Sequence, residues 1–192
     1  MNVRRIPLGE QPVMPWANGG GSTRQVAIDP PGASMATGFR WRVSIATVAR
    51  GGPFSVLPGV DRSTWLLAGA GVRLDCGDRQ VVLDRRMQRF DFAGETPIAC
   101  TLLAGPCEDL NVMAARSSVR VDAALHELAP GASLDLSAAP QRLLLAVRGS
   151  FSLDGVGAVD ERHALRIDDA THGVLRVGAE GCAVLVAAFT AR

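Results

Sequence analysis

The sequence contains no lysine and no tyrosine, so all 20 of its basic side chains are arginine. The absence of lysine excludes Schiff-base chemistry and a P-loop lysine. The chain also lacks a GxSxG elbow, a P-loop motif and a Rossmann GxGxxG after a predicted strand, which argues against those enzyme classes. Catalysis is therefore less expected than binding.

Long apolar runs and excess charge of one sign are also missing. No apolar run approaches the roughly 20 residues that a membrane span needs. The N-terminal segment lacks the apolar core of a signal peptide. The formal net charge is only +1, which provides no bulk basic field for nucleic acid. We therefore expect a cytoplasmic protein with no nucleic-acid and no membrane partner.

Histidine and cysteine are sparse and poorly placed for metal binding. The three histidines, His126, His163 and His172, do not form an HxH or HExxH spacing. We therefore expect no metal and no other cofactor. No two of the four cysteines form a CxxC pair, so we expect four reduced, mostly buried thiols at Cys76, Cys100, Cys107 and Cys182.

What the sequence does contain is many short apolar segments separated by Gly, Pro and Asp. Residues 40–48 alternate, with one face carrying Trp41, Val43, Ile45 and Thr47 and the other Arg42, Ser44, Ala46 and Val48. A period of two is typical of a strand. No 12-residue helical pattern occurs, so the fold class predicted is all-β, a sandwich or barrel. The face of Arg42 is either open to solvent or the wall of a barrel lumen.

The chain also looks internally duplicated. The stretch 66–71 resembles 144–149 at an offset of 78 residues, and 98–104 resembles 182–188. This predicts two β-rich halves within one compact unit spanning residues 1–192, with approximate boundaries 1–115 and 120–192. The alternative is that any two β-meanders resemble each other at this level.

Four segments in the first half, the alternating strand that begins at Trp41 among them, are too unusual for generic sheet, and each allows two interpretations. Residues 15–24 carry three successive glycines, which form either a tight turn or a pocket wall. In residues 52–62, Phe54 is expected to plug the loop onto the core. Arg62 points into a barrel mouth or pairs on the surface with Asp61.

The segment 105–113 places Asp109 and Asn111 two residues apart, on one face of an extended chain. They could serve a ligand or hold Arg42 or Arg62 in place. The alternative is an Asx-type turn.

In this order and at these intervals, PWANGGGSTR, WRVSIA, GGPFSVLPGVDR and GPCEDLNVM resemble the HutD/Ves family. The resemblance covers residues 5–115 strongly. It implies a bicupin, meaning two cupin-type β-barrel or jelly-roll halves of the RmlC-like kind in one chain, without the metal-binding histidines of other cupins. Ala17 and Gln25 stand where the family usually has Lys and Glu, so specificity in this chain could differ.

The resemblance further implies a bacterial protein that binds an anion such as N-formylglutamate and regulates or limits histidine utilisation, or has a Ves-type stress role. On the matched positions, the candidate ligand-binding residues are Trp16, Asn18, Thr23, Arg42, Ser44, Ser55, Arg62, Asp109 and Asn111. Catalytic residues are not assigned.

Two enzymatic alternatives stay open. One is a metal-independent cupin enzyme acting on an acylated amino acid, with Asp109 or Asp61 as general base. The other is a metal-dependent cupin using His163 or His172. A homodimer is expected by analogy with other cupins only.

Overall fold

The computed structural model describes residues 2–192, and its regular structure is almost entirely β. Among these residues the only helical element is the 3-10 turn η1 (Leu8–Glu10). The predicted all-β class is confirmed. No helix among the described residues has the length and apolar character that a membrane-spanning helix needs. The chain divides into two compact units, which we call the central unit (residues 12–119) and the terminal unit (residues 2–11 and 120–192).

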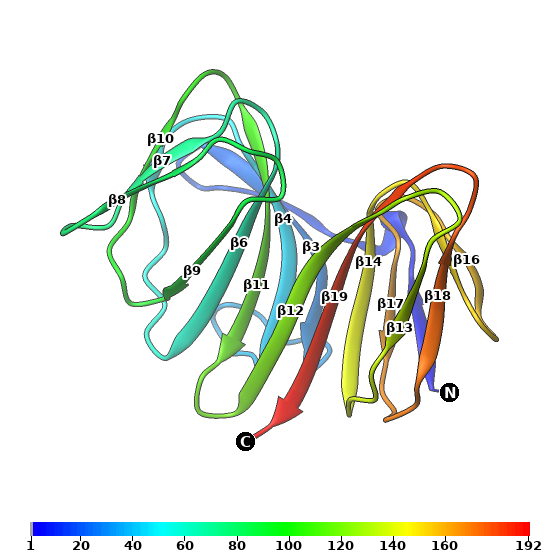
Figure 1. Ribbon diagram of the computed structural model, residues 1–192. Helices are drawn as coiled ribbons and strands as arrows, with labels where there is room; N and C mark the ends of the chain where they lie inside the picture. The colour runs from blue at the N-terminus through cyan, green and yellow to red at the C-terminus, as the bar shows by residue number, and fades with distance from the viewer. Residues whose placement is uncertain (1) are drawn as a thin grey trace. The chain divides into compact units, whose positions relative to one another are not determined.

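The described strands of the central unit form a six-stranded sheet, ordered β2-β3-β4-β11-β6-β9, and a four-stranded sheet, ordered β5-β10-β7-β8. The curved larger sheet, with β3, β4, β11 and β6 side by side, is visible in Figure 1. The strands are β2 (Val13–Pro15), β3 (Gly21–Asp29), β4 (Trp41–Val48), β5 (Gly52–Pro53), β6 (Val60–Ala68), β7 (Val72–Asp75), β8 (Gln80–Leu83), β9 (Arg89–Ala93), β10 (Ala99–Leu102) and β11 (Cys107–Ala115).

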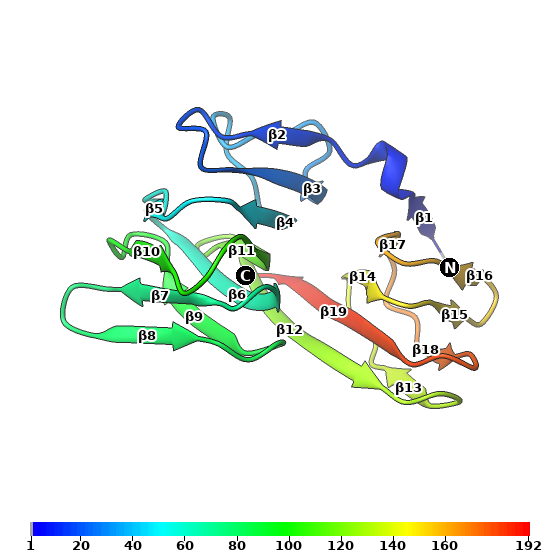
Figure 2. The ribbon, with the colours of Figure 1, turned by 90° about the horizontal axis from the view of Figure 1, so that it is seen from above.

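The described part of the terminal unit contains a five-stranded sheet, ordered β1-β17-β14-β19-β12, and a four-stranded sheet, ordered β13-β18-β15-β16. Figure 2 shows these strands from a second direction. They are β1 (Val3–Ile6), β12 (Val119–Leu128), β13 (Ser133–Leu136), β14 (Gln141–Arg148), β15 (Phe151–Leu153), β16 (Gly157–Val159), β17 (Ala164–Ile167), β18 (Gly173–Val177) and β19 (Cys182–Ala191).

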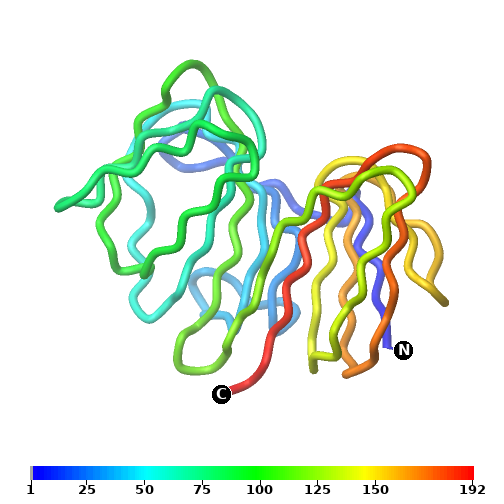
Figure 3. The backbone as a smooth tube through the Cα atoms, viewed as in Figure 1, coloured from blue at the N-terminus to red at the C-terminus, as the bar shows by residue number. Residues whose placement is uncertain are grey.

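The start of the chain belongs to the terminal unit. The expected first half, 1–115, instead grouped it with the residues that follow it in the sequence. β1 pairs antiparallel with β17, from Val3 opposite Ile167 to Ile6 opposite Ala164. The blue N-terminal segment runs beside this orange strand in Figure 3. The side-chain amide of Gln11 adds a hydrogen bond of 2.6 Å to the Arg162 carbonyl. Backbone pairing at a sheet edge therefore decides where residues 2–11 pack.

The two units share one strand order. The row β4-β11-β6-β9 of the central unit corresponds to β12-β19-β14-β17 of the terminal unit, and β5-β10-β7-β8 corresponds to β13-β18-β15-β16. A bulge interrupts both central strand pairs, at Leu67 in β6 and at Val147 in β14. The predicted similarity of the two halves thus extends to topology.

The predicted residue correspondence between the halves was wrong. The offset of 78 pairs Gly71 with Gly149, whereas the bulges pair Gly69 with Gly149. Both glycines have positive φ, +92° at Gly69 and +69° at Gly149. A Cβ at Gly69 would also lie 2.6 Å from the Pro106 carbonyl oxygen, so the start of β11 approaches too closely for a side chain. Likewise, residues 98–104 correspond to β18 and not to 182–188.

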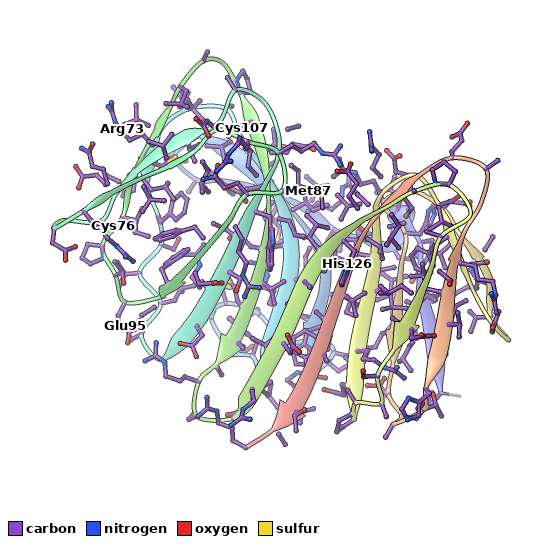
Figure 4. All side chains as sticks on the ribbon, viewed as in Figure 1. Arg73, Cys76, Met87, Glu95, Cys107 and His126 are labelled. Carbon is purple, nitrogen blue, oxygen red and sulfur yellow. The ribbon has the colours of Figure 1, made fainter. Side chains whose placement is uncertain are left out.

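The interiors of the two units differ in chemistry. The terminal unit is filled by an apolar core that includes Leu144, Phe151, Leu165, Leu175 and Val184. The central unit has a core that carries three of the four cysteines, Cys76, Cys100 and Cys107. Figure 4 labels Cys76 and Cys107 among the side chains of this unit. All four cysteines are buried and free, as expected.

Candidate functional site

The central unit encloses a cavity of about 460 Å³, within the size range of small-molecule sites. All of its lining residues belong to this unit. The lining includes every candidate binding residue predicted from the sequence, namely Trp16, Asn18, Thr23, Arg42, Ser44, Ser55, Arg62, Asp109 and Asn111. The structure therefore brings together residues that lie up to 95 positions apart in the chain (Trp16 to Asn111).

The floor of the cavity is the inner face of the larger sheet. Strand pairing aligns Ser44 with Asn111 and, one strand further, with Thr64. A second row aligns Arg42, Met113 and Arg62. Because side chains alternate along a strand, every second residue of β4, β6 and β11 points to this face. The lumen interpretation of the Arg42 face is confirmed.

Arg62 is buried, with 7% of its surface exposed, and is held by contacts of three kinds. Its Nη1 donates to the Ser55 carbonyl at 3.3 Å and its Nη2 donates to the Asn111 side-chain oxygen at 3.2 Å. Its guanidinium carbon lies 5.4 Å from the Phe54 ring centroid and 4.8 Å from that of Phe92. Its Nε is buried without a hydrogen-bond partner.

The charge of Arg62 is only partly compensated. Burial lowers the pKa of Arg62 to about 10; the charge of Asp109 opposes this shift and that of Arg42 adds to it. The alternative of a surface pair with Asp61 is wrong, because Asp61 instead accepts a 2.7 Å hydrogen bond from Arg116.

Arg42 is the second buried cation of the cavity, with 6% of its surface exposed. Its Nε donates to the Gln25 side-chain oxygen at 2.9 Å, and its Nη1 lies 3.7 Å from the Met35 sulfur. Burial lowers the pKa of Arg42. Within residues 2–192, neither Arg42 nor Arg62 has a carboxylate at ion-pair distance. Both guanidiniums thus face the cavity with neutral hydrogen-bond partners.

Asp109 and Asn111 form a short relay to Arg62. The Asn111 amide nitrogen donates to the Asp109 carboxylate, while the Asn111 oxygen accepts from Arg62. Burial raises the pKa of Asp109 to about 7, with a smaller contribution from Glu108, against the opposing effects of Arg62 and Asn111. Both residues lie within β11, so the Asx-turn alternative is wrong, and the expectation that they hold an arginine in place is confirmed for Asn111.

The glycine-rich segment forms both a turn and a wall of the cavity. Trp16 donates from its indole nitrogen to the Thr23 hydroxyl at 2.8 Å. The Asn18 side-chain oxygen caps the turn by accepting from the Gly20 amide at 2.9 Å. A Cβ on Gly21 would collide with the Thr47 carbonyl and approach the Trp16 ring, so this position requires glycine. Phe54 packs against the cysteine-containing core, as predicted, and its ring also lines the cavity.

Several lining residues lie outside the set of candidate binding residues. They are Met14, Pro15, Ala17, Met35, Ala46, Val48, Arg50, Gly52, Pro53, Leu57, Cys100 and Met113. The period of two had already placed Ala46 and Val48 on the face of Arg42, and the same period counted from Asn111 identifies Met113. Met35 and Cys100 carry no comparable signal, because their position depends on how a loop and the smaller sheet pack.

The lining chemistry suits an anion better than a metal. In the described chain, no group of three or more His, Cys, Asp or Glu side chains could hold a metal ion. His163, one of the two histidines in the metal-dependent alternative, lies in the terminal unit and contacts the Glu161 carbonyl. His126 lies on β12 (Figure 4). Buried guanidiniums with free donors, by contrast, bind carboxylates strongly.

Comparison with known proteins gives matches to HutD and Ves proteins. The family model HutD matches residues 9–185. Protein Ves of Citrobacter koseri is 39% identical over 110 residues, which are 57% of this chain and 56% of the relative. The match thus spans little more than half of that relative. An uncharacterised 21.2 kDa protein in the hutC 3′ region of Pseudomonas putida is 32% identical over 156 residues, 81% of this chain and 80% of the relative.

Solved structures show the same similarity over the whole chain. HutD from Pseudomonas fluorescens has a TM-score of 0.81 at 26% identity and covers 99% of both chains. More distant matches, at about 10% identity, indicate the fold alone. They are the bacterial pirin YhhW of Escherichia coli, with a TM-score of 0.74, and an oxalate decarboxylase of Lactobacillus farciminis, with a TM-score of 0.68. The fold is therefore cupin-like and all-β.

Proposed function

The chain belongs to the HutD family, and on that premise we propose that it is a binding protein for a small carboxylate-bearing metabolite held in the cavity of the central unit. The observation that carries the proposal is the pair Arg42 and Arg62, both buried and both facing the cavity without a carboxylate partner. A buried cation with only neutral partners is costly to maintain, and an anionic ligand would offset that cost.

The residues around the two arginines have complementary roles in this proposal. Arg42 and Arg62 bind the carboxylate through charge-assisted hydrogen bonds. Ser44 and Thr23 offer hydroxyl groups to a formyl or amide group. Trp16 and Phe54 exclude water from the bound ligand. Asn111 orients Arg62 through the 3.2 Å hydrogen bond.

For the physiological role, we propose that the ligand is an intermediate such as N-formylglutamate and that binding regulates or limits histidine utilisation. The family and the names of its relatives support this role. A Ves-type stress role is the alternative, supported by the similarity to protein Ves. We also propose that the chain is a bicupin, since both units repeat one strand order.

Titration calorimetry with N-formylglutamate, glutamate and urocanate tests the binding proposal. We expect saturable binding of N-formylglutamate and a loss of roughly 100-fold or more in Arg62→Met, in which a charged partner is lost from a buried pair. The matched control is Arg73→Met, because Arg73 is an exposed arginine of β7 that does not line the cavity. Absence of heat and of thermal shift with all three compounds, at millimolar concentration, would contradict the proposal.

One observation favours an enzymatic second candidate. A carboxyl group with a pKa near 7 in a cavity fits a general acid or base, and Asp109 has this property. The candidate activity is a metal-independent reaction of an acylated amino acid. Turnover of N-formylglutamate that is lost in Asp109→Asn would support it, whereas binding without turnover would favour the binding protein.

A further inference from the structure

The cavity changes character from its floor to its mouth. The floor residues Arg42, Ser44, Arg62 and Asn111 are polar and are each at most 7% exposed. The more accessible lining residues include five large apolar side chains from three separate segments, beside the exposed polar residues Asn18, Arg50 and Ser55. We call the five the apolar rim: Met14, Trp16, Met35, Phe54 and Leu57. Met14 and Met35 are 38% and 42% exposed. An anion bound at the floor therefore lies close to apolar side chains that are partly open to water.

The rim lies directly against both cations. The Met35 sulfur is 3.7 Å from Nη1 of Arg42, and the Phe54 ring centroid is 5.4 Å from the guanidinium carbon of Arg62. A carboxylate bound to either guanidinium thus places its next few atoms beside a thioether or an aromatic ring. These side chains offer no strong hydrogen bond to a polar ligand, but they gain free energy when they bury apolar groups.

From this arrangement we infer that the cavity prefers amphipathic anions: a carboxylate whose other end is an apolar acyl or aryl group larger than formyl binds more tightly than N-formylglutamate. The inference rests on the proposed binding function and names the ligand class of the same cavity. The cavity volume of about 460 Å³ is large enough for a ligand of this kind. The two methionines, which have flexible thioether side chains, adapt to acyl groups of different shape.

A homologous series tests the inference. Affinities are measured by titration calorimetry for N-formyl-, N-acetyl-, N-butanoyl- and N-hexanoyl-glutamate, which share the same two carboxylates. We expect the affinity to rise about two- to fourfold for each added CH₂, the factor expected for transfer of one methylene from water to an apolar contact. The double variant Met14→Ser/Met35→Ser should lose most of this gain with chain length.

The matched control is Leu103→Ser. Leu103 is 43% exposed, close to the 38% of Met14 and the 42% of Met35, but it lies outside the cavity lining. This variant should retain the full gain with chain length.

The outcomes separate the two proposals. Binding of N-formylglutamate with an affinity that stays flat or falls along the series overturns the amphipathic ligand and leaves the binding function in place. Failure of every member of the series to bind the folded protein overturns both. An equal loss of the gain in Leu103→Ser and in the rim variant would also overturn the role of the rim.

Discussion

The central and terminal units place a buried arginine at the same point of the same strand pair and use it differently. The last residue pair before the bulge is Leu66–Asp109 in the central unit and Ala146–Val184 in the terminal unit. Arg62 lies four residues before Leu66 in β6, and Arg142 lies four residues before Ala146 in β14. Arg142 is 2% exposed and donates to the carbonyls of Ser137, Asp169 and Thr171. Arg62 instead faces the cavity and the Asn111 side chain.

The neighbouring interior positions explain the difference. Thr64, Asp109 and Asn111 of the central unit correspond to Leu144, Val184 and Val186 of the terminal unit by the same register. Leu144 and Val184 belong to the buried apolar core, which Val186 packs against. The comparison teaches that one strand topology gives either a filled core or a binding cavity, depending on whether a few inward positions are apolar or polar.

The largest expected effect comes from exchanging counterpart residues. Val184→Asp places a carboxyl group in the filled core, where we expect a loss of roughly 3–5 kcal/mol in the free energy of unfolding. Asp109→Val removes a half-buried carboxyl from the cavity and should leave the free energy of unfolding unchanged or higher. Urea denaturation followed by circular dichroism checks both. Similar losses in the two variants would refute the difference between the units.

The two arginines give the second prediction. Arg142→Met leaves three carbonyl groups without their buried donor, so we expect the free energy of unfolding to fall by about 2–3 kcal/mol. The free energy of unfolding should fall by less in Arg62→Met, because the cavity admits water to the Ser55 carbonyl and to Asn111. Thermal denaturation of both variants measures the difference. A larger loss in Arg62→Met than in Arg142→Met would show that Arg62 is mainly structural.

A pH dependence restricted to the central unit is the third prediction. The pKa of Asp109 is about 7 in the folded protein, above the ordinary value near 3.9 of an unfolded chain. Its contribution to stability is therefore fully present below about pH 4 and is lost as the pH rises through 7. Of the other groups near Asp109, Cys100 and Cys107 stay neutral because burial raises their pKa values to about 12 and 11, while Arg62 stays charged.

Asp109→Asn should accordingly raise the melting temperature at pH 8, raise it by less at pH 5 and leave it unchanged only below about pH 4, because asparagine resembles the protonated acid. Differential scanning calorimetry at the two pH values provides the measurement. Val184→Asn is the counterpart control and should destabilise equally at both pH values. The prediction fails when Asp109→Asn has the same effect at pH 5 and pH 8.

The smallest expected effect concerns the wall of the cavity. Thr23→Val removes the acceptor of the Trp16 indole nitrogen, at a cost of about 1 kcal/mol. All three tryptophans of the chain lie in the central unit, so tryptophan fluorescence reports on that unit alone. We expect fluorescence-detected urea unfolding to shift in Thr23→Val and to remain unchanged in Thr101→Val, an exposed threonine of β10. Equal midpoints for the two variants would show that this hydrogen bond adds no stability.

Much of the site could be predicted from the sequence because strand alternation is a local property. The alternation of Trp41 and Arg42 placed Arg42 and Ser44 on one face, and the two-residue spacing did the same for Asp109 and Asn111. The predicted residue correspondence between the halves was wrong at Gly69 and Gly149. The two halves share a bulge and a close backbone approach, and many different sequences can form these features.

The sequence by itself determined the all-β class and which residues share one face of a strand, since a period of two depends only on neighbouring residues. Only the tertiary structure decided that Asn111 links Asp109 to Arg62, that Met35 lies against Arg42 and that residues 2–11 join the terminal unit. The contacts Met35–Arg42, Arg62–Asn111 and Val3–Ile167 join residues 7, 49 and 164 positions apart. Their geometry depends on strand register, sheet curvature and loop packing, which no local pattern specifies.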